Sequence, residues 1–334
     1  MDNTQQHAPG LLTVSPSPHI RGRDTTASIM FEVLIALTPA TVWGVYVFGT
    51  RALLTVLVCM VAAILTEGLL ELLLHRKVTV NDGSAAVTGL LLAMCLPVTL
   101  PLWQAALGAI FAIAVVKQLF GGIGKNFMNP ALAGRAFLML AFTANMTHFT
   151  AAYDRVWLSA ADCVASATPL APLKQGLLPE ATLTDLFLGK TGGCIGEVSA
   201  ALLLAGGIYL LLRRVITWHI PVAYLATVTL LSLIFPRIAG APLQSVAAEL
   251  CTGGLMLGAF FMATDYVTSP VTRGGKLVFG IGCGALTVFI RYFGGYPEGG
   301  SFAILIMNSL VWYLDRAFRP RVYGKGKQGG ASRG

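Results

Sequence analysis

Three acidic residues of this sequence lie in or beside apolar segments, where a charge is costly. Glu67 lies within a long apolar run, Asp82 precedes a short run, and Asp265 follows another short run. Ionisable groups inside apolar spans commonly mark ion or proton pathways, and carboxylates at broken helix ends suit Na⁺ or H⁺. All three are therefore candidates for an ion pathway. Two other interpretations stay open: Glu67 can belong to a structural ion pair, and either aspartate can simply cap a helix.

Three further polar residues accompany these candidates. Glu71 lies one helical turn from Glu67, close to basic residues that can simply neutralise it. Asn129 opens another short apolar run. Arg135 lies within that run and needs an anionic partner, which the sequence does not identify.

A second kind of chemistry is suggested by the longest polar interruption, which runs from about 143 to 191. In this stretch the small residues Ala165, Ser166 and Ala167 precede Thr168, and Pro169 follows it. A covalent attachment through a side-chain oxygen needs an exposed hydroxyl among small neighbours, and loops on rigid scaffolds often carry such chemistry. Without further information, a simple connecting loop is the more economical interpretation.

The composition identifies the elements that must position these residues. The chain has 334 residues, of which 55% are hydrophobic and only 11% are charged, whereas a soluble domain carries about 25% charged residues. The net charge is +8, but the basic residues lie between apolar runs and at the end of the chain. This distribution is typical of a membrane topology signal and argues against a nucleic-acid partner. The six cysteines form no C-x-x-C pair, which argues against a disulfide framework or a cysteine-ligated cluster.

Ten apolar segments predict an all-α polytopic membrane protein that lies in a lipid bilayer. A bilayer crossing needs about 20 residues. By that measure the third, fifth and eighth segments are short or broken. The segments are 29–48, 52–74, 84–96, 103–120, 129–142, 193–212, 221–235, 253–264, 277–293 and 301–318.

The charge pattern and a faint internal repeat predict the organisation of the chain. Sixteen of the 23 lysines and arginines fall on one side if ten spans are drawn, so both termini are expected in the cytoplasm and the Thr168 loop outside it. Residues 87–94 resemble 256–263, and a Phe-Gly-Gly triplet follows both the fourth and the ninth span. Two inverted five-helix repeats are therefore expected, with a ligand or ion site at their interface, although glycines can also serve close helix packing alone. The expected parts are a polar arm (1–28), a first repeat (29–142), the outer loop (143–192), a second repeat (193–318) and a basic tail (319–334).

Several motifs, in this order, resemble those of one known family. The chain is similar to the D subunits of Rnf complexes, which are ion-translocating ferredoxin:NAD⁺ oxidoreductases, and to the homologous B subunits of the Na⁺-translocating NADH:quinone reductase. The short arm before the first span favours the Rnf subunits. The motifs that carry the resemblance are residues 17–21 (SPHIR), 82–91 (DGSAAVTGLL), 127–131 (FMNPA), 165–170 (ASATPL) and 262–270 (MATDYVTSP).

The resemblance implies a flavoprotein subunit of a redox-driven ion translocase in the bacterial cytoplasmic membrane. It implies FMN joined to Thr168 by a phosphoester, which a flavin transferase installs from FAD. Ser166 stands where glycine is commoner in the family motif, and Asp162 fits its acidic start. A second flavin, non-covalent riboflavin, is implied among the helices, and the other membrane and peripheral subunits of the complex are implied as partners.

Three classes of function remain to be distinguished. The first is the flavin-carrying redox subunit; because the sequence has no dinucleotide-binding fingerprint, this chain is not expected to bind NAD itself. A cofactor-free channel or transporter for small solutes also fits inverted repeats with broken helices. A purely structural membrane subunit is the third interpretation.

Overall fold

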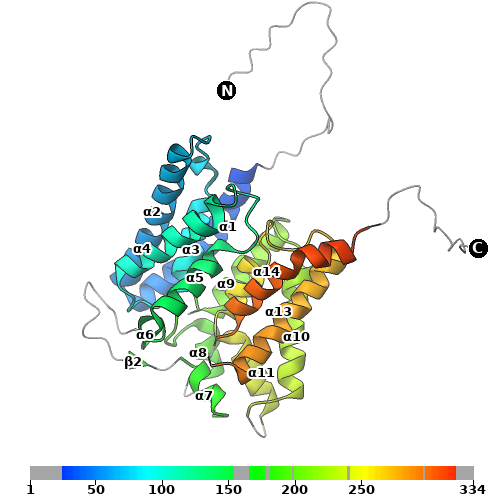
Figure 1. Cartoon of the computed structure of the whole chain (residues 1–334). Coiled ribbons are helices and arrows are strands. Elements are labelled where there is room, and N and C mark those ends of the chain that lie inside the picture. Colours follow the sequence, from blue (N-terminus) through cyan, green and yellow to red (C-terminus); the bar gives the residue numbers. More distant parts are fainter. Residues whose placement is uncertain are drawn as a thin grey trace, which may run out of the picture.

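The computed structural model describes residues 25–153, 165–166, 168–177, 181–197, 199–238, 241–295 and 298–320, and these form a helical bundle. The helices of the N-terminal half pack side by side with those of the C-terminal half (Figure 1). The start of α1 and the end of α14 lie toward one end of the bundle, whereas β2, α7 and α8 lie at the opposite end. Asp162 lies outside the described residues.

Within these ranges, three helices are long and apolar enough to cross a membrane: α1 (Thr26–Phe48), α2 (Thr50–Leu73) and α13 (Arg273–Phe293). A fourth candidate is a broken span, in which α11 (Pro242–Cys251) meets the segment Leu255–Met262 at an angle of 62°. The shorter apolar helices are α3 (Ser84–Met94), α4 (Leu102–Phe111) continued by the π-helical η2 (Ala112–Gln118), α5 (Pro130–Ala141), α9 (Ala200–Leu212) and α10 (His219–Ile234).

The remaining elements are short, apart from the final helix, α14. They are η1 (Val80–Asp82), α6 (Thr143–Met146), β1 (Phe149–Thr150), β2 (Ala165–Ser166), α7 (Leu170–Lys174), α8 (Leu183–Leu188), α12 (Leu255–Leu257), the π-helical η3 (Gly258–Met262) and α14 (Gly300–Ala317).

A helix occupies each of the ten apolar segments expected from the sequence, but several helices are too short to cross a bilayer unaided. Two features differ from the expectation. The helix expected from residue 193 begins only at Ala200, because the backbone N–H groups of Ile195 and Gly196 bond to the carbonyls of Leu96 and Met94 at 3.1 and 2.7 Å. Helix α11 was not expected, because its polar residues break the apolar run.

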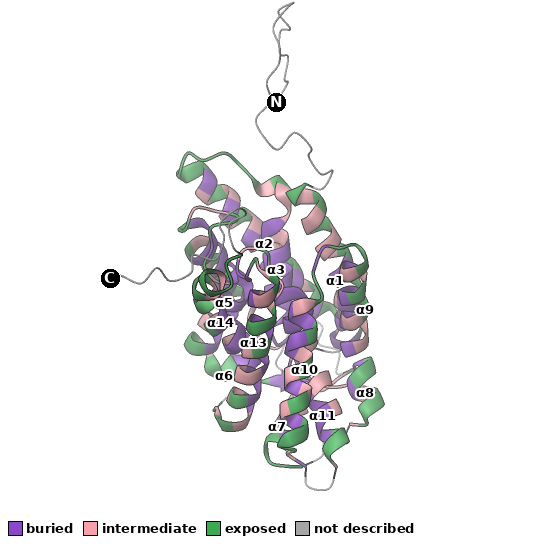
Figure 2. Ribbon diagram, turned by 90° about the vertical axis from the view of Figure 1, so that its right-hand side faces the viewer, coloured by how far each residue is buried: buried purple, intermediate pink, exposed green. Residues whose placement is uncertain are grey.

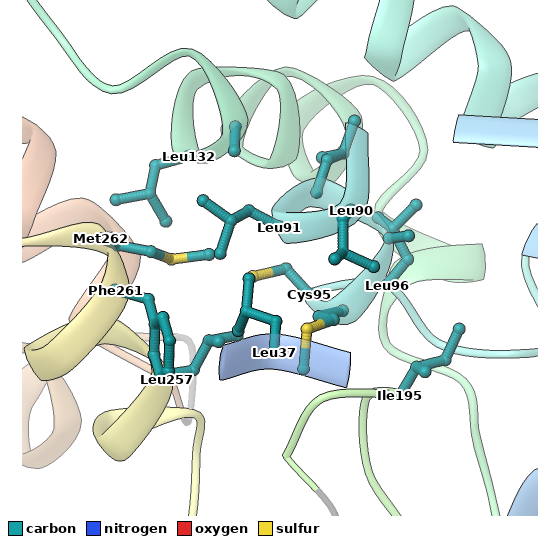
Figure 3. Packing of buried hydrophobic residues seen from close by; sticks show 14 of the residues in the cluster. Leu37, Leu90, Leu91, Cys95, Leu96, Leu132, Ile195, Leu257, Phe261 and Met262 are labelled. Carbon is teal, nitrogen blue, oxygen red and sulfur yellow. The ribbon is translucent and has the colours of Figure 1, made fainter. Parts of the chain in front are cut away.

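The interior of the bundle is apolar and is shared between the two halves. Figure 2 shows buried residues along the inward-facing sides of the helices. In Figure 3, Leu91 of α3 and Leu132 of α5 lie beside Met262 of η3. The outward sides of α1 and α2 expose large apolar side chains such as Leu65 and Leu69, as expected for helices that contact lipid.

Helices α2 and α3 approach each other at Gly89. A Cβ atom there would lie 2.7 Å from both the carbonyl oxygen of Cys59 and the Cα atom of Met60. We expect Gly89→Ala to destabilise the protein by about 1–3 kcal/mol, because the two backbones must separate. Gly68→Ala is the matched control, since its Cβ would meet only a Val80 methyl at 3.4 Å. Thermal unfolding in detergent should show a loss for the first variant and no loss for the second; equal stabilities would contradict this close approach.

Candidate functional site

A cavity of about 400 Å³ lies between the two halves of the chain, at the end of the bundle where α1 begins. It is bounded by the starts of α3 and α5 and by the end of η3, so three interrupted helices converge on it. Apolar side chains form most of its wall, and a few polar groups project from it. The apolar residues include Ile29, Met30, Val33, Leu91, Phe260 and Phe261, and the polar residues are Thr26, Ser84, Thr88, Lys117, Asn126, Asn129, Thr264, Asp265 and Tyr266.

Lys117 joins two of the predicted ion-pathway residues at one side of this cavity. Its Nζ lies 2.6 Å from Glu67 Oε1 and 2.6 Å from the hydroxyl of Ser84. The Ser84 hydroxyl in turn donates to Asp82 Oδ1 at 2.5 Å, and the Gln118 amide donates to Glu67 Oε1 at 3.0 Å. Glu67 and Lys117 are both buried, so their opposite charges compensate each other away from water.

These contacts give both carboxylates a structural role, and their place in an ion pathway stays a prediction. Glu67 forms a structural ion pair, yet the pair lies beside a cavity. Asp82 also accepts from the backbone N–H of Ser84, the first residue of α3, at 2.8 Å, but the N-cap position that the sequence suggested for it is occupied by Gly83. Glu71 does not use its basic neighbours; its carboxylate accepts from the backbone and the hydroxyl of Thr79.

Lys117 is a functional candidate that the sequence reasoning missed, because it was considered only as a topology charge. The sequence did indicate this residue, because Lys117 is a charged residue inside the apolar segment 103–120. The structure adds that Lys117 lies in the π-helical η2. Such segments in helices occur frequently at functional sites.

Asp265 lines the cavity from the other half of the chain. It lies in the connection after η3, where its Oδ2 accepts from the Thr268 hydroxyl at 2.9 Å. Burial raises the pKa of the Asp265 carboxyl, and the hydrogen bond from Thr268 acts in the opposite direction. Asn129 links the halves directly: its oxygen accepts from the N–H groups at the start of α5, and its amide donates to the Met262 carbonyl at 3.2 Å.

Arg135 finds the anionic partner that the sequence could not name. It forms an ion pair with Glu298, which lies just before α14, and it donates to the Ser301 hydroxyl at 3.0 Å. Both charged side chains are buried. The pair thus fastens α5 of the first half to α14 of the second half.

Thr168 lies at the opposite end of the bundle from the cavity, between β2 and α7. Strand β2 pairs antiparallel with β1, with Ser166 opposite Phe149. The Thr168 carbonyl accepts from the N–H of Ala171 at 2.9 Å, which starts α7. Contrary to the expectation of an exposed hydroxyl, Thr168 is only 4% exposed, because the segment folds back onto the second half of the chain.

Helix α7 docks on the second half of the chain through its apolar side chains. Leu170 and Leu173 pack in a small apolar cluster with Leu186, Ile238 and Ala248. Lys174 Nζ donates to the carbonyls of Gly294 and Gly295 at 2.7 and 3.1 Å, beyond the end of α13.

Two basic residues lie at the same end of the bundle as Thr168. Lys174 is the last residue of α7, and the buried Arg291 is ion-paired with Glu249. The side chain of Leu170 and the guanidinium of Arg291 both lie against Gly253, where an added Cβ would be 2.4 and 2.7 Å from them. Gly253 has a φ of +67°, so its backbone also favours glycine.

A comparison with known protein families decides the class of this protein. A sequence model of the family described as NQR2, RnfD, RnfE matches residues 13–324. The chain belongs to this family. The resemblance to the D subunits of Rnf complexes is confirmed, and the family together with the apolar helices makes the chain a mostly helical, multi-pass membrane protein.

Similar members of the NQR2, RnfD, RnfE family carry names that refer to one kind of complex. The chain is 48% identical to the D subunit of the Na⁺-translocating ferredoxin:NAD⁺ oxidoreductase complex of Acetobacterium woodii, over 94% of this chain and 95% of the relative. It is 41% identical to the D subunit of the proton-translocating ferredoxin:NAD⁺ oxidoreductase complex of Clostridium ljungdahlii, over 94% and 96%. It is 40% identical to the D subunit of the ion-translocating oxidoreductase complex of Stutzerimonas stutzeri, over 92% and 94%.

Proposed function

We propose that this chain is the D-type membrane subunit of an ion-translocating ferredoxin:NAD⁺ oxidoreductase in a bacterial cytoplasmic membrane. The observation that carries the proposal is the similarity to relatives with that name over more than nine-tenths of both chains. As in those complexes, other membrane and peripheral subunits are its partners. The chain contributes to a redox-driven translocase, and we propose that it has no complete site for NAD.

Electron transfer through this subunit rests on covalent FMN at Thr168, installed by a flavin transferase. The transferase forms a bond between the Thr168 oxygen and the FMN phosphate of FAD; AMP leaves, and the hydroxyl gives up its proton. When bound, FMN accepts and passes on electrons, while the protein holds it in place. Residues Asp162 and Ser166 belong to the recognition motif, and the docked α7 fixes the attachment point.

Mass spectrometry of the peptide that contains Thr168 tests this proposal directly. Protein co-expressed with a flavin transferase should carry FMN, minus one water, on that peptide. An unmodified peptide in cells that do attach flavin to a known substrate of the transferase would contradict the proposal. That result, together with solute movement in liposomes, would favour the cofactor-free transporter.

The cavity is the place we propose for the non-covalent riboflavin. Its volume, about 400 Å³, lies within the range of about 300–1,000 Å³ that is usual for small-molecule sites. Its apolar walls suit an isoalloxazine ring, and the polar groups Lys117, Asn129 and Asp265 suit the ring edge and the ribityl chain.

Narrowing the cavity should reduce this bound riboflavin. Thr88 lines the cavity from α3, and Thr88→Met places a longer side chain in it. We expect severalfold less riboflavin to be extracted from purified protein by acid, measured by chromatography with fluorescence detection. The covalent flavin on Thr168 in the same sample is the internal control and should not change. An unchanged amount of extracted riboflavin in the variant would show that riboflavin binds outside this cavity.

We further propose ten spans in two inverted five-helix repeats, with cytoplasmic termini and an extracytoplasmic Thr168 loop. Two observations support this arrangement. The start of α1 and the end of α14 lie at the opposite end of the bundle from α7 (Figure 1). Gln118 and Arg291 both stand two residues before a Phe-Gly-Gly triplet, and both contact a buried glutamate, Glu67 or Glu249. Reporter fusions at the C-terminus and in the loop should report opposite sides of the membrane.

The ion pathway is proposed to pass Glu67, Asp82 and Asp265 at the cavity. Carboxylates of this kind serve Na⁺ and H⁺ equally. The converging ends of α3, α5 and η3 form the kind of interrupted-helix site that transporters use for ions.

A further inference from the structure

A second group of buried side chains lies apart from the cavity, around Arg135. It consists of Cys194 and Glu197, in the segment before α9, and Glu298, before α14. One potential ligand atom from each of the three lies within 4.8 Å of the others. Cys194 and Glu298 are buried and Glu197 is half-buried, so solvent does not separate these groups. Neither the sequence motifs nor the proposed flavin chemistry accounts for this cluster.

The hydrogen bonding of the cluster is incomplete. Glu298 uses Oε2 for its ion pair with Arg135, but among the described residues Oε1 of Glu298 and Oε1 of Glu197 accept no hydrogen bond. The Glu298 side chain is only 4% exposed. A buried carboxylate oxygen without a donor costs free energy. Each of these oxygens therefore lacks a positive or hydrogen-bonding partner.

The shape of the backbone leaves room for these carboxylates. A Cβ at Gly254 would lie 3.0 Å from Glu197 Oε1, and one at Gly193 would lie 3.2 Å from Glu197 Oε2. Glycine at both positions lets the Glu197 carboxylate lie against the main chain. The side chain is thereby directed by packing on both sides, as is required of a preorganised ligand.

We propose that Cys194 Sγ and the carboxylates of Glu197 and Glu298 bind a zinc ion. Sulfur selects zinc over hard cations such as Na⁺, Mg²⁺ or Ca²⁺, which prefer oxygen ligands. Tetrahedral zinc, with bonds of about 2.0–2.3 Å, places its ligand atoms roughly 3.5 Å apart. Ligand atoms that already lie within 4.8 Å of one another need only a small contraction.

The charges of the cluster balance with zinc in place. Binding displaces the proton of the Cys194 thiol, because zinc binds the thiolate. One thiolate and two carboxylates then face zinc and the Arg135 guanidinium, which together carry three positive charges. Arg135 Nη2 lies 3.9 Å from Cys194 Sγ and orients Glu298 from outside the metal, as groups around metal ligands commonly do.

With three protein ligands, the zinc would keep a fourth position for a water molecule. Its proposed effect on the fold is to connect separate segments. It ties the segment that enters the second half, at Cys194 and Glu197, to the start of the last helix, at Glu298. Through Arg135 it also reaches α5 of the first half. This inference does not depend on the flavin at Thr168, which is not a ligand.

The test is the metal content of the intact complex, purified from membranes and washed free of loosely bound metal. Cys194→Ser should lower zinc by one equivalent per complex in elemental analysis. Cys283→Ser removes another buried thiol, outside the cluster, and should leave zinc unchanged. An equal zinc content in the wild-type complex and in the Cys194→Ser and Cys283→Ser variants would overturn the proposal.

Cobalt provides a readout that does not require a variant to assemble. Wild-type complex that is stripped of zinc and reloaded with Co²⁺ should show the absorption bands of tetrahedral cobalt. These bands lie in the red part of the spectrum, at longer wavelengths than the flavin absorption. Glu197→Gln should weaken these bands. Wild-type complex without zinc, or reloaded complex without such bands, would equally overturn the proposal.

Discussion

Thr168→Val should abolish covalent flavin in this protein. Valine nearly matches threonine in shape but has no hydroxyl, so the phosphoester cannot form while the packing around position 168 is preserved. Protein co-expressed with a flavin transferase should fluoresce under ultraviolet light on a denaturing gel, and the variant band should be dark. The loss should be essentially complete, because Thr168 is the proposed attachment residue.

Ser166→Ala is the matched control, because it removes the other hydroxyl of the same motif. Its band should remain fluorescent. A fluorescent Thr168→Val band would show that the flavin is attached elsewhere. A dark Thr168→Val variant whose complex still reduces NAD⁺ with ferredoxin at the normal rate would support the purely structural interpretation of this chain.

Lys117→Met should cause the largest loss of stability among single substitutions at the cavity. It leaves the buried Glu67 carboxylate without its cation and deprives the Ser84 hydroxyl of a donor. Breaking a buried pair by removing one partner costs about 3–5 kcal/mol. Thermal unfolding in detergent should show this loss. Lys190→Met is the control, because Lys190 is exposed, Asp185 is partly exposed and the two are 4.0 Å apart. Such a surface pair contributes about 0–1 kcal/mol.

The double variant Lys117→Met/Glu67→Gln separates the structural role of Glu67 from its proposed role in ion transport. It removes both charges, so most of the stability lost in Lys117→Met should return. Ion transport by the reconstituted complex should nevertheless stay strongly reduced, because the pathway has lost a carboxylate. A stable double variant that transports ions at the normal rate would reduce Glu67 to a structural partner.

Local patterns in the sequence predicted the helices well but not their contacts. The short third and fifth apolar segments correctly predicted the short helices α3 and α5, and Asn129 begins α5 as its N-cap. Helix α11 was missed, because its buried face includes the polar residues Ser245 and Glu249. Contacts with distant elements bury them, so the helix lacks the periodic apolar pattern by which a helix is recognised in a sequence.

The candidate sites depended still more on tertiary structure. Glu67 and Lys117 are 50 residues apart, and Arg135 and Glu298 are 163 residues apart. A charged residue inside an apolar run indicates that a partner exists, but only the packing of helices identifies it. The burial of Thr168 was not predicted for the same reason, since the residues that cover its segment come from distant elements.

That burial has a consequence for the order of events during synthesis. The apolar cluster that holds α7 includes Ile238 and Ala248, which are translated after Thr168. At about 5–20 residues per second, the roughly 80 residues from Thr168 to Ala248 take about 4–16 s to synthesise. During this interval α7 has not yet been held by the whole of its apolar cluster. The proposed transferase would therefore act in competition with folding, and flavin attachment would be a step of biogenesis that precedes the closure of this end of the bundle.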